Sequence, residues 1–197
     1  MAESATIPAI TAEPMLGHLA EAMTAASGEA ARLVELAHQG QWNLRLNSDE
    51  MALQNLAREH FGLALPVAPN TTETADGITA LWLGPDEWLL TSADEAALSG
   101  KATAFQAAAA GSHIALTDLS DNRLVLELSG PQATSLLARG CGLDLIAIGT
   151  GDCAQTLFGR AQIILQLVDD APRYRIFVRK SFADYLARFL IAEMRDL

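Results

Sequence analysis

Short apolar runs joined by tight turns recur along this 197-residue chain and alternate with segments of helical pattern. The run "ITALWLGPDEWLLTS" (78–92) holds two apolar stretches joined at Gly84-Pro85-Asp86, which is typical of a β-hairpin. Residues 113–130 and 153–180 repeat the pattern around turns that contain Asp. Hairpins make neighbouring strands antiparallel, whereas parallel strands need long crossovers. The sequence therefore predicts an α+β fold of antiparallel sheets with alternating hairpins and helices.

Helical patterns fill the intervals between these turns. They cover residues 53–61, 92–110 and 130–140, and a last helix that begins at Ser181 with an apolar face of Phe182, Tyr185, Leu186, Phe189 and Leu190. A first strand is predicted at 42–47, and the Pro-containing segment 63–77 is predicted to be a loop. We predict an N-terminal arm over 1–40 with a helix from Gly17. One domain follows over 41–197, built of two similar halves, 41–112 and 113–197.

The loop length of the 78–91 hairpin decides where Trp82 and Trp88 point. A three-residue loop pairs them on one face of the sheet, and a four-residue loop places them on opposite faces. Because Pro85 and Asp86 suit the centre of a type I turn, the four-residue loop is predicted. Core packing is the first interpretation of both tryptophans, anchoring of a partner protein is the second, and a ligand clamp comes last.

Charge and apolar patterning limit the classes of partner. The net charge of −11 repels nucleic-acid phosphates, so no nucleic acid is expected. Residues 1–100 hold 14 acidic and three basic residues, whereas residues 101–197 are balanced, which suggests that the halves face different neighbours. No secretory signal and no apolar stretch of the roughly 20 residues that span a bilayer is seen. With two cysteines, the chain is expected in the reducing cytoplasm, without a membrane partner.

The sequence offers no convincing catalytic, cofactor or metal site. Gly149, Gly151 and Ala154 match a dinucleotide-binding motif, but too few residues follow for a helical crossover, so a structural loop is predicted. The histidines are scattered, which argues against a metal site. Asp118 and Asp121 flank a turn, where Asp favours local hydrogen bonds. We predict that this chain has no catalytic residue and binds no cofactor or metal itself.

The segment "RYRIFVRK" (173–180) is the candidate partner interface. In a strand, its side chains alternate between two faces. One face carries Arg173, Arg175, Phe177 and Arg179. This is either a solvated sheet face or a basic stripe that docks on a larger subunit, because Arg and aromatic residues are favoured at interfaces. Trp82 and Trp88 are added as candidate anchors.

Five stretches in order resemble the gamma subunit of heterotetrameric sarcosine oxidase. They are "LWLGPDEWLL", "DLSDNRLVLELSGPQATSLLARGCGLDL", "CAQT", "DDAP" and "SFADYLARFL". The resemblance implies a fold like the folate-binding domain of glycine-cleavage aminomethyltransferase. It also implies alpha and beta partner subunits that hold FAD, FMN, NAD and tetrahydrofolate. The complex would oxidise sarcosine to glycine, yielding hydrogen peroxide and methylenetetrahydrofolate, with gamma as an accessory subunit that has no active site.

Two other functions stay open at this point. One is a stand-alone folate-binding or aminomethyltransferase-like protein of the same fold. The other is an interaction protein with no link to one-carbon chemistry. Tetrahydrofolate binding by the isolated chain would favour the first of these, and co-purification with flavin-containing subunits would favour the sarcosine oxidase subunit.

Overall fold

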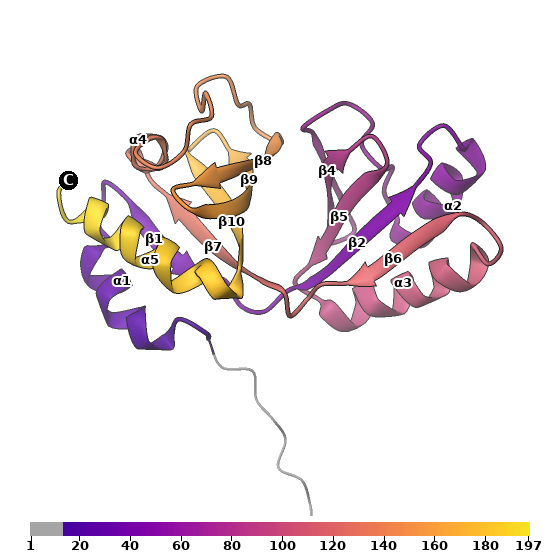
Figure 1. The fold of residues 1–197 in the computed structure, drawn as a ribbon, viewed down its shortest axis with the longest axis horizontal. Helices are drawn as coiled ribbons and strands as arrows, with labels where there is room; N and C mark the ends of the chain where they lie inside the picture. Colours follow the sequence, from indigo (N-terminus) through magenta and orange to yellow (C-terminus); the bar gives the residue numbers. More distant parts are fainter. Residues whose placement is uncertain (1–13) are drawn as a thin grey trace, which may run out of the picture.

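The computed structural model describes residues 14–197 and contains two five-stranded sheets, each covered by helices on one face (Figure 1). Every strand pairing between the named strands is antiparallel. The predicted α+β class with antiparallel sheets is confirmed. Residues 1–13 of the predicted arm lie outside the described residues. No helix of the described part is long and apolar enough to cross a bilayer.

Sheet 1 has the strand order β3-β4-β5-β2-β6. Its strands are β2 (Gly40–Leu46), β3 (Thr72–Ala75), β4 (Ile78–Gly84), β5 (Glu87–Ser92) and β6 (Ile114–Asp118). Helices α2 (Met51–Phe61) and α3 (Glu95–Ala108) bury Phe61, Leu98 and Phe105 against one face, together with Trp88 of β5. The short edge strand β3 lies within the segment that was predicted to be a loop.

Sheet 2 has the strand order β1-β7-β10-β9-β8. Its strands are β1 (Arg32–Glu35), β7 (Arg123–Ser129), β8 (Cys153–Phe158), β9 (Ala161–Asp169) and β10 (Arg173–Arg179). One face is covered by α4 (Ala133–Ala138), by α5 (Lys180–Met194) and by the N-terminal pair η1 (Gly17–Leu19) and α1 (Ala20–Ala26). The predicted helix from Gly17 is confirmed.

The two sheets repeat one arrangement. The spatial order β6-β2-β5-β4-β3 of sheet 1 corresponds to β1-β7-β10-β9-β8 of sheet 2. Along the chain, a helix follows β2 and β5 in the first half, and a helix follows their counterparts β7 and β10 in the second half. Each half is thus a ferredoxin-like β-α-β-β-α-β unit with one additional edge strand. In the second half, the last strand is β1, which comes from the N-terminal region. The predicted arm therefore completes sheet 2.

The predicted hairpin over 113–130 is wrong. Strand β6 pairs with β2 in sheet 1, whereas β7 pairs with β1 and β10 in sheet 2. The segment between them redirects the chain: the Asp118 side chain accepts hydrogen bonds from the amide and hydroxyl of Ser120, and the Leu119 amide donates to the Gln41 carbonyl. Because β6 belongs to sheet 1, the halves divide after β6, not at the predicted boundary between 112 and 113.

The β4–β5 hairpin forms as predicted, but with a different register. Trp82 pairs with Trp88, Gly84 pairs with Glu87, and the register shifts between Trp82 and Gly84. The tight turn at Pro85-Asp86 and the irregularity at Leu83 place both tryptophans on the same face of the sheet. The predicted four-residue loop, with the rings on opposite faces, is wrong because a bulge takes up one residue.

The buried face of α5 is rotated from the predicted one. Leu186 and Leu190 are buried as expected, but Phe182 and Tyr185 are each 37% exposed. Ala183 and Ala187 are fully buried in their place. Alanine lets the helix backbone approach the sheet, so small side chains, and not only the large apolar ones, define the contact.

The two sheets also contact each other. Their helix-free faces, which we call the inner faces, enclose an apolar cluster of Leu81, Leu89, Val125, Cys153, Ile164 and Phe177. Figure 1 shows the two lobes side by side, with the chain passing between them at the β1–β2 and β6–β7 connections. Edge strands also meet, because the Thr72 amide donates to Gly151 and the Cys153 amide donates to Asn70.

Candidate partner interface

The basic segment forms strand β10, and its side chains alternate between two environments as predicted. The helix-covered core of sheet 2 receives Tyr174, Ile176 and Val178. The inner face receives the side chains of Arg173, Arg175, Phe177 and Arg179. This face is turned towards sheet 1, so a large part of the predicted stripe lies between the two sheets and not on an open surface.

Phe177 lies at the centre of the contact between the sheets. Its side chain is fully buried, and it packs in one cluster with Leu81 and Leu89 of sheet 1. A fully buried ring has no surface to offer to another subunit. The predicted contribution of Phe177 to docking is therefore wrong, because the second sheet of the same chain already covers it.

Arg173 and Arg175 form ion pairs within the chain. The Arg173 Nε donates to Asp169 Oδ2 at 2.7 Å, and its Nη1 lies 3.7 Å from Glu127 Oε2. The Arg175 Nε lies 3.9 Å from the same Glu127 oxygen. The Arg175 side chain is 27% exposed, so it is half-buried. Arg173 has an acceptor on its own sheet, whereas the buried Arg175 Nε has no hydrogen-bond partner among the described residues. The docking role of both arginines stays a prediction.

Arg179 lies directly opposite Arg123 across the β7–β10 pair. Burial lowers the pKa of the Arg123 guanidinium, the charge of Arg179 lowers it further, and the Glu87 carboxylate acts in the opposite direction. The Arg123 Nη1 is buried and has no hydrogen-bond partner among the described residues. The nearby Glu87 accepts instead from Asn43 at 2.9 Å and from Arg45 at 2.6 Å.

Arg123 is the functional candidate that sequence reasoning missed. The sequence predicts a turn just before it and a strand that begins at Arg123, but nothing local distinguishes this arginine from other exposed charges. Its spacing from Val125 and Glu127 does indicate a shared strand face. Which strand faces it depends on the pairing of β7 with β10, across about 50 residues of sequence, and local patterns carry no such information.

Trp82 and Trp88 lie on the helix-covered side of sheet 1, away from the inner-face arginines. Trp88 is fully buried, and its Nε1 donates to the Pro66 carbonyl at 2.8 Å. Trp82 is partly buried and packs against the same core. Core packing is therefore confirmed for Trp88, and Trp82 contributes to that core with part of its surface. As candidate partner anchors they do not form one surface with the arginines.

The Gly149–Gly151 segment is a loop, and strand β8 follows it directly. The Gly149 amide donates to Asp152 Oδ2 at 2.8 Å, and the Gly151 amide donates to the Leu167 carbonyl at 2.9 Å. A dinucleotide motif needs these amides and the N-terminus of a following helix for the pyrophosphate. The predicted structural loop is confirmed, because the amides bind protein atoms and no helix follows.

Other reactive groups in the described chain are isolated or bound. No group of three or more His, Cys, Asp or Glu side chains suited to a metal ion occurs in residues 14–197. The Lys180 ammonium donates to Asp121 at 3.0 Å and lowers the pKa of that carboxyl. Burial raises the pKa of the Cys153 thiol to about 12. A protonated, buried thiol is a poor nucleophile.

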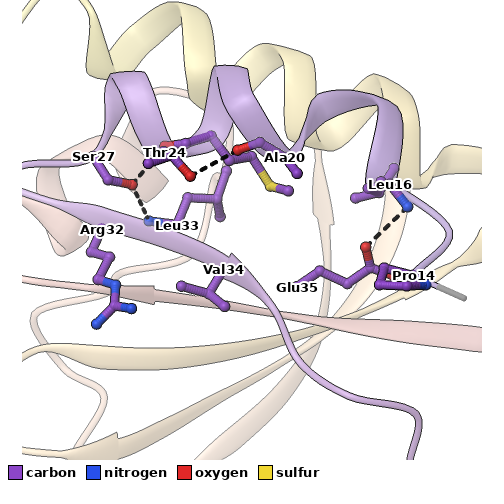
Figure 2. Close-up of a pocket in the computed structure, with 11 residues that line it drawn as sticks. Pro14, Leu16, Ala20, Thr24, Ser27, Arg32, Leu33, Val34 and Glu35 are labelled. Atoms are coloured by element: carbon purple, nitrogen blue, oxygen red, sulfur yellow. Dashed lines mark hydrogen bonds between the residues drawn. The ribbon is translucent and has the colours of Figure 1, made fainter.

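A pocket of about 330 Å³ lies between α1 and β1, at the edge of sheet 2 (Figure 2). Its Ser27 and Glu35 side chains already have partners within the chain, whereas the exposed Arg32 forms none of the ion pairs found in residues 14–197. The Ser27 hydroxyl accepts from the Leu33 amide at 3.1 Å, and the Glu35 carboxylate accepts from the amides of Met15 and Leu16 at 2.9 Å each. The pocket therefore presents apolar surface and no set of converging reactive groups.

Comparisons with known proteins identify the family of the chain. Residues 45–194 match the sarcosine oxidase, gamma subunit family. The chain is 33% identical over 183 residues to the sarcosine oxidase subunit gamma of Corynebacterium sp. (strain P-1), with 91% of this chain and 88% of the relative covered. The gamma subunit of Corynebacterium sp. (strain U-96) is 34% identical over 185 residues, with the same coverage.

Solved structures give the same grouping. A chain of the heterotetrameric sarcosine oxidase from Corynebacterium sp. U-96 superposes with a TM-score of 0.84 and 32% identity, covering 94% of this chain and 95% of that one. Aminomethyltransferase T of the glycine cleavage system from Bartonella henselae superposes with a TM-score of 0.62, covering 86% of this chain and 48% of that one. At 14% identity, the second match shows a shared fold. The chain belongs to the sarcosine oxidase gamma subunit family.

Proposed function

We propose that this chain is the accessory, non-catalytic gamma subunit of a heterotetrameric sarcosine oxidase, bound to alpha and beta subunits. The observation that carries the proposal is similarity along nearly the whole chain, at a TM-score of 0.84, to a chain of such a heterotetramer. The complex would oxidise sarcosine to glycine, forming hydrogen peroxide and methylenetetrahydrofolate. This chain would contribute binding surface to the assembly.

The chemistry of the described residues supports an accessory role. General acid–base and nucleophilic catalysis need converging groups with perturbed pKa values in a cleft. Here the strongly perturbed thiol of Cys153 is buried and donates to the carbonyls of Thr71 and Trp82. The inner-face carboxylates of Glu87 and Glu127 lie beside arginines. Groups held in this way stabilise the fold and are not positioned for a substrate.

FAD, FMN, NAD and tetrahydrofolate are proposed to lie in the alpha and beta subunits. The residues of this chain do not fit a dinucleotide at the one motif that suggests it, because the loop 149–151 leads into a strand and its amides bind protein atoms. We therefore derive no step of the reaction through this chain. The cytoplasm is the proposed location, since the sequence has two cysteines and both are free thiols.

Co-expression tests this proposal. The chain, carrying an affinity tag, is expressed together with the alpha and beta subunits of the same organism and purified through the tag. We expect both subunits to co-purify with flavin absorbance and with sarcosine-dependent release of hydrogen peroxide. An active alpha–beta complex that never retains the tagged chain would contradict the proposal.

The alternative is a stand-alone folate-binding or aminomethyltransferase-like protein. The fold that the chain shares with aminomethyltransferase T is the observation that favours this alternative. Titration of the isolated chain with tetrahydrofolate, followed by calorimetry, distinguishes the two functions. The subunit proposal expects no binding by the isolated chain, and stoichiometric binding would favour the alternative.

A further inference from the structure

We propose that Arg179, with the charge of the half-buried Arg123 behind it, binds a carboxylate of another subunit, and that it is an anchor of this chain in its complex. The inference rests on the proposed subunit function and adds the residues and the chemistry of the contact. It starts from a conflict of charges that the described chain leaves unresolved.

Like charges stand opposite each other at this pair. Arg179 and Arg123 are Cα partners across antiparallel strands, and like charges in that position are destabilising. Arg123 is half-buried, and its Nη1 has no acceptor among the described residues. A buried guanidinium N–H without an acceptor costs more than a neutral one. In a chain of net charge −11, this concentration of positive charge calls for an anion from outside.

Carboxylates of the chain itself are not available to the pair. Of the ion pairs formed within residues 14–197, none includes Arg123 or Arg179. Glu87, the acid that acts on Arg123, is held by Arg45 and Asn43. Glu127, two strand positions past Val125 on the same face, is shared by Arg173 and Arg175.

Arg123 is half-buried beside Glu87 of sheet 1, and it begins a row of side chains that is exposed from Arg179 onward. We call this the open row, and it consists of Arg123, Arg179, Gln162 and Leu157. Ile163 of β9 pairs with Val178 of β10, so the residue before it, Gln162, lies opposite Arg179. Gln162 pairs in turn with Leu157 of β8, and the row therefore continues from Arg179 across β9 and β8. Arg179, Gln162 and Leu157 are exposed, and Leu157 is 58% exposed. The next row inward, with Phe177 and Ile164, is covered by sheet 1.

The composition of the open row favours a protein carboxylate over a free anion. Arginine forks bind carboxylates through two parallel hydrogen bonds, and Gln162 can donate a further one. The exposed Leu157 provides apolar area next to these polar groups, as a protein interface requires and a small anion does not. The acidic character of the whole chain opposes polyanionic partners. The occupant is therefore an Asp or Glu side chain of a partner subunit.

Arg179→Glu tests the contact, because Arg179 is exposed and its replacement leaves the buried core unchanged. We expect the affinity of the purified chain for the alpha–beta complex, measured by calorimetry, to fall at least about 30-fold, as for the loss of one partner of an interfacial charge pair. The matched control is Arg58→Glu, which makes the same change of charge on an exposed position of α2. The control is expected to bind like the wild type.

Arg179→Lys identifies the partner group. The change keeps the positive charge and introduces an amine, which carbodiimide couples to a carboxylate in direct contact. We expect mass spectrometry of the treated complex to find a cross-link from position 179 to an Asp or Glu of a partner subunit, and none from position 58 in Arg58→Lys.

The outcomes separate this inference from the proposed function. If the wild-type chain does not bind the alpha–beta complex, the subunit proposal fails and this inference fails with it. If the wild type and Arg179→Glu bind equally, the inference alone is overturned. It is also overturned if inorganic phosphate raises the melting temperature of the wild type but not of Arg179→Glu while assembly is unchanged, because the pair is then a small-anion site.

Discussion

At the scale of single residues, Trp82 and Trp88 show that burial, and not residue type, determines how much a side chain contributes to the free energy of unfolding. They face each other across one hairpin, yet Trp88 is fully buried and hydrogen-bonded whereas Trp82 is partly exposed. We expect Trp88→Ala to lower the free energy of unfolding by about 3–5 kcal/mol. Trp82→Ala, the matched control, should cost about 1–2 kcal/mol. Urea denaturation of both variants measures the difference, and equal losses would contradict it.

Cys153 gives the chain a pH dependence with a definite sign. The pKa of its thiol is raised from an ordinary value of 9.0 to about 12, chiefly by burial. Between these values the unfolded chain releases a proton that the folded chain keeps, so the contribution to stability is present below pH 9 and is lost as the pH rises. The loss approaches about 1.4 kcal/mol per pH unit. Cys153→Ala should remove this part of the pH dependence.

The Cys153 measurement is a comparison of urea denaturation between wild type and variant from pH 8 to pH 10.5. Subtracting the two curves removes the lysines and tyrosines that titrate in the same range. A difference that does not change with pH would mean that the folded thiol ionises as readily as the unfolded one.

Arg175 is half-buried and lies 3.9 Å from Glu127, its Cα partner on β7. We expect Arg175→Glu to destabilise the isolated chain by about 1 kcal/mol or more, because two carboxylates would then stand opposite each other. A freely solvated arginine would give a change within about 0.5 kcal/mol. Thermal or urea denaturation of the isolated chain measures the change in stability and distinguishes these two outcomes. Arg58→Glu, at an exposed position, is the control.

At the scale of elements, the N-terminal segment is a structural part of sheet 2. Leu16, Leu19, Met23 and Leu33 are buried in its core, and β1 forms the edge next to β7. Burial of four such side chains contributes about 6–12 kcal/mol, which is comparable with the whole stability of a domain, about 5–15 kcal/mol.

Deletion of residues 1–35 is therefore expected to abolish cooperative folding. Deletion of residues 1–13 keeps all four buried side chains and is the matched control. Near-UV circular dichroism and urea denaturation compare the two truncated chains. A sharp unfolding transition after removal of residues 1–35 would show that sheet 2 does not depend on β1.

At the scale of the whole molecule, two repeated units are interlocked. The chain leaves sheet 2 after β1, builds all of sheet 1, and returns to sheet 2 at β7. The centre of the inner faces is filled by the protein itself, with Phe177, Leu89 and Ile164 in one cluster. A duplicated fold that fills the centre of its own inter-sheet space presents outer surfaces, edges and the open row at the margin of sheet 2, which suits a subunit that binds other subunits.

The isolated chain is expected to be colourless. The loop 149–151 leads into a strand, and its amides bind protein atoms, so no phosphate cradle is formed there. Absorbance of the purified chain between 350 and 500 nm, before and after denaturation, measures bound flavin. Release of one flavin per chain would contradict this expectation.

Local patterns in the sequence determined the elements. The Gly84-Pro85-Asp86 turn, the spacing of apolar residues in α5 and the alternation along β10 were sufficient to place strands and helices and to predict an antiparallel α+β fold, because each depends on residues near in sequence. The family could also be inferred from five ordered stretches. Gly149 and Gly151 were correctly predicted to form a loop, because a crossover helix had no room to follow.

Only the tertiary structure decided which elements meet. The pattern around Asp121 fits a hairpin as well as it fits a passage between sheets, and the free edges of β2 and β7 settle the choice. The same holds for Phe177, which fits an exposed stripe until sheet 1 covers it, and for Arg123, which becomes a candidate once β7 pairs with β10. Strand pairing and face coverage join residues far apart in sequence, and their free energy comes from contacts that no local window contains.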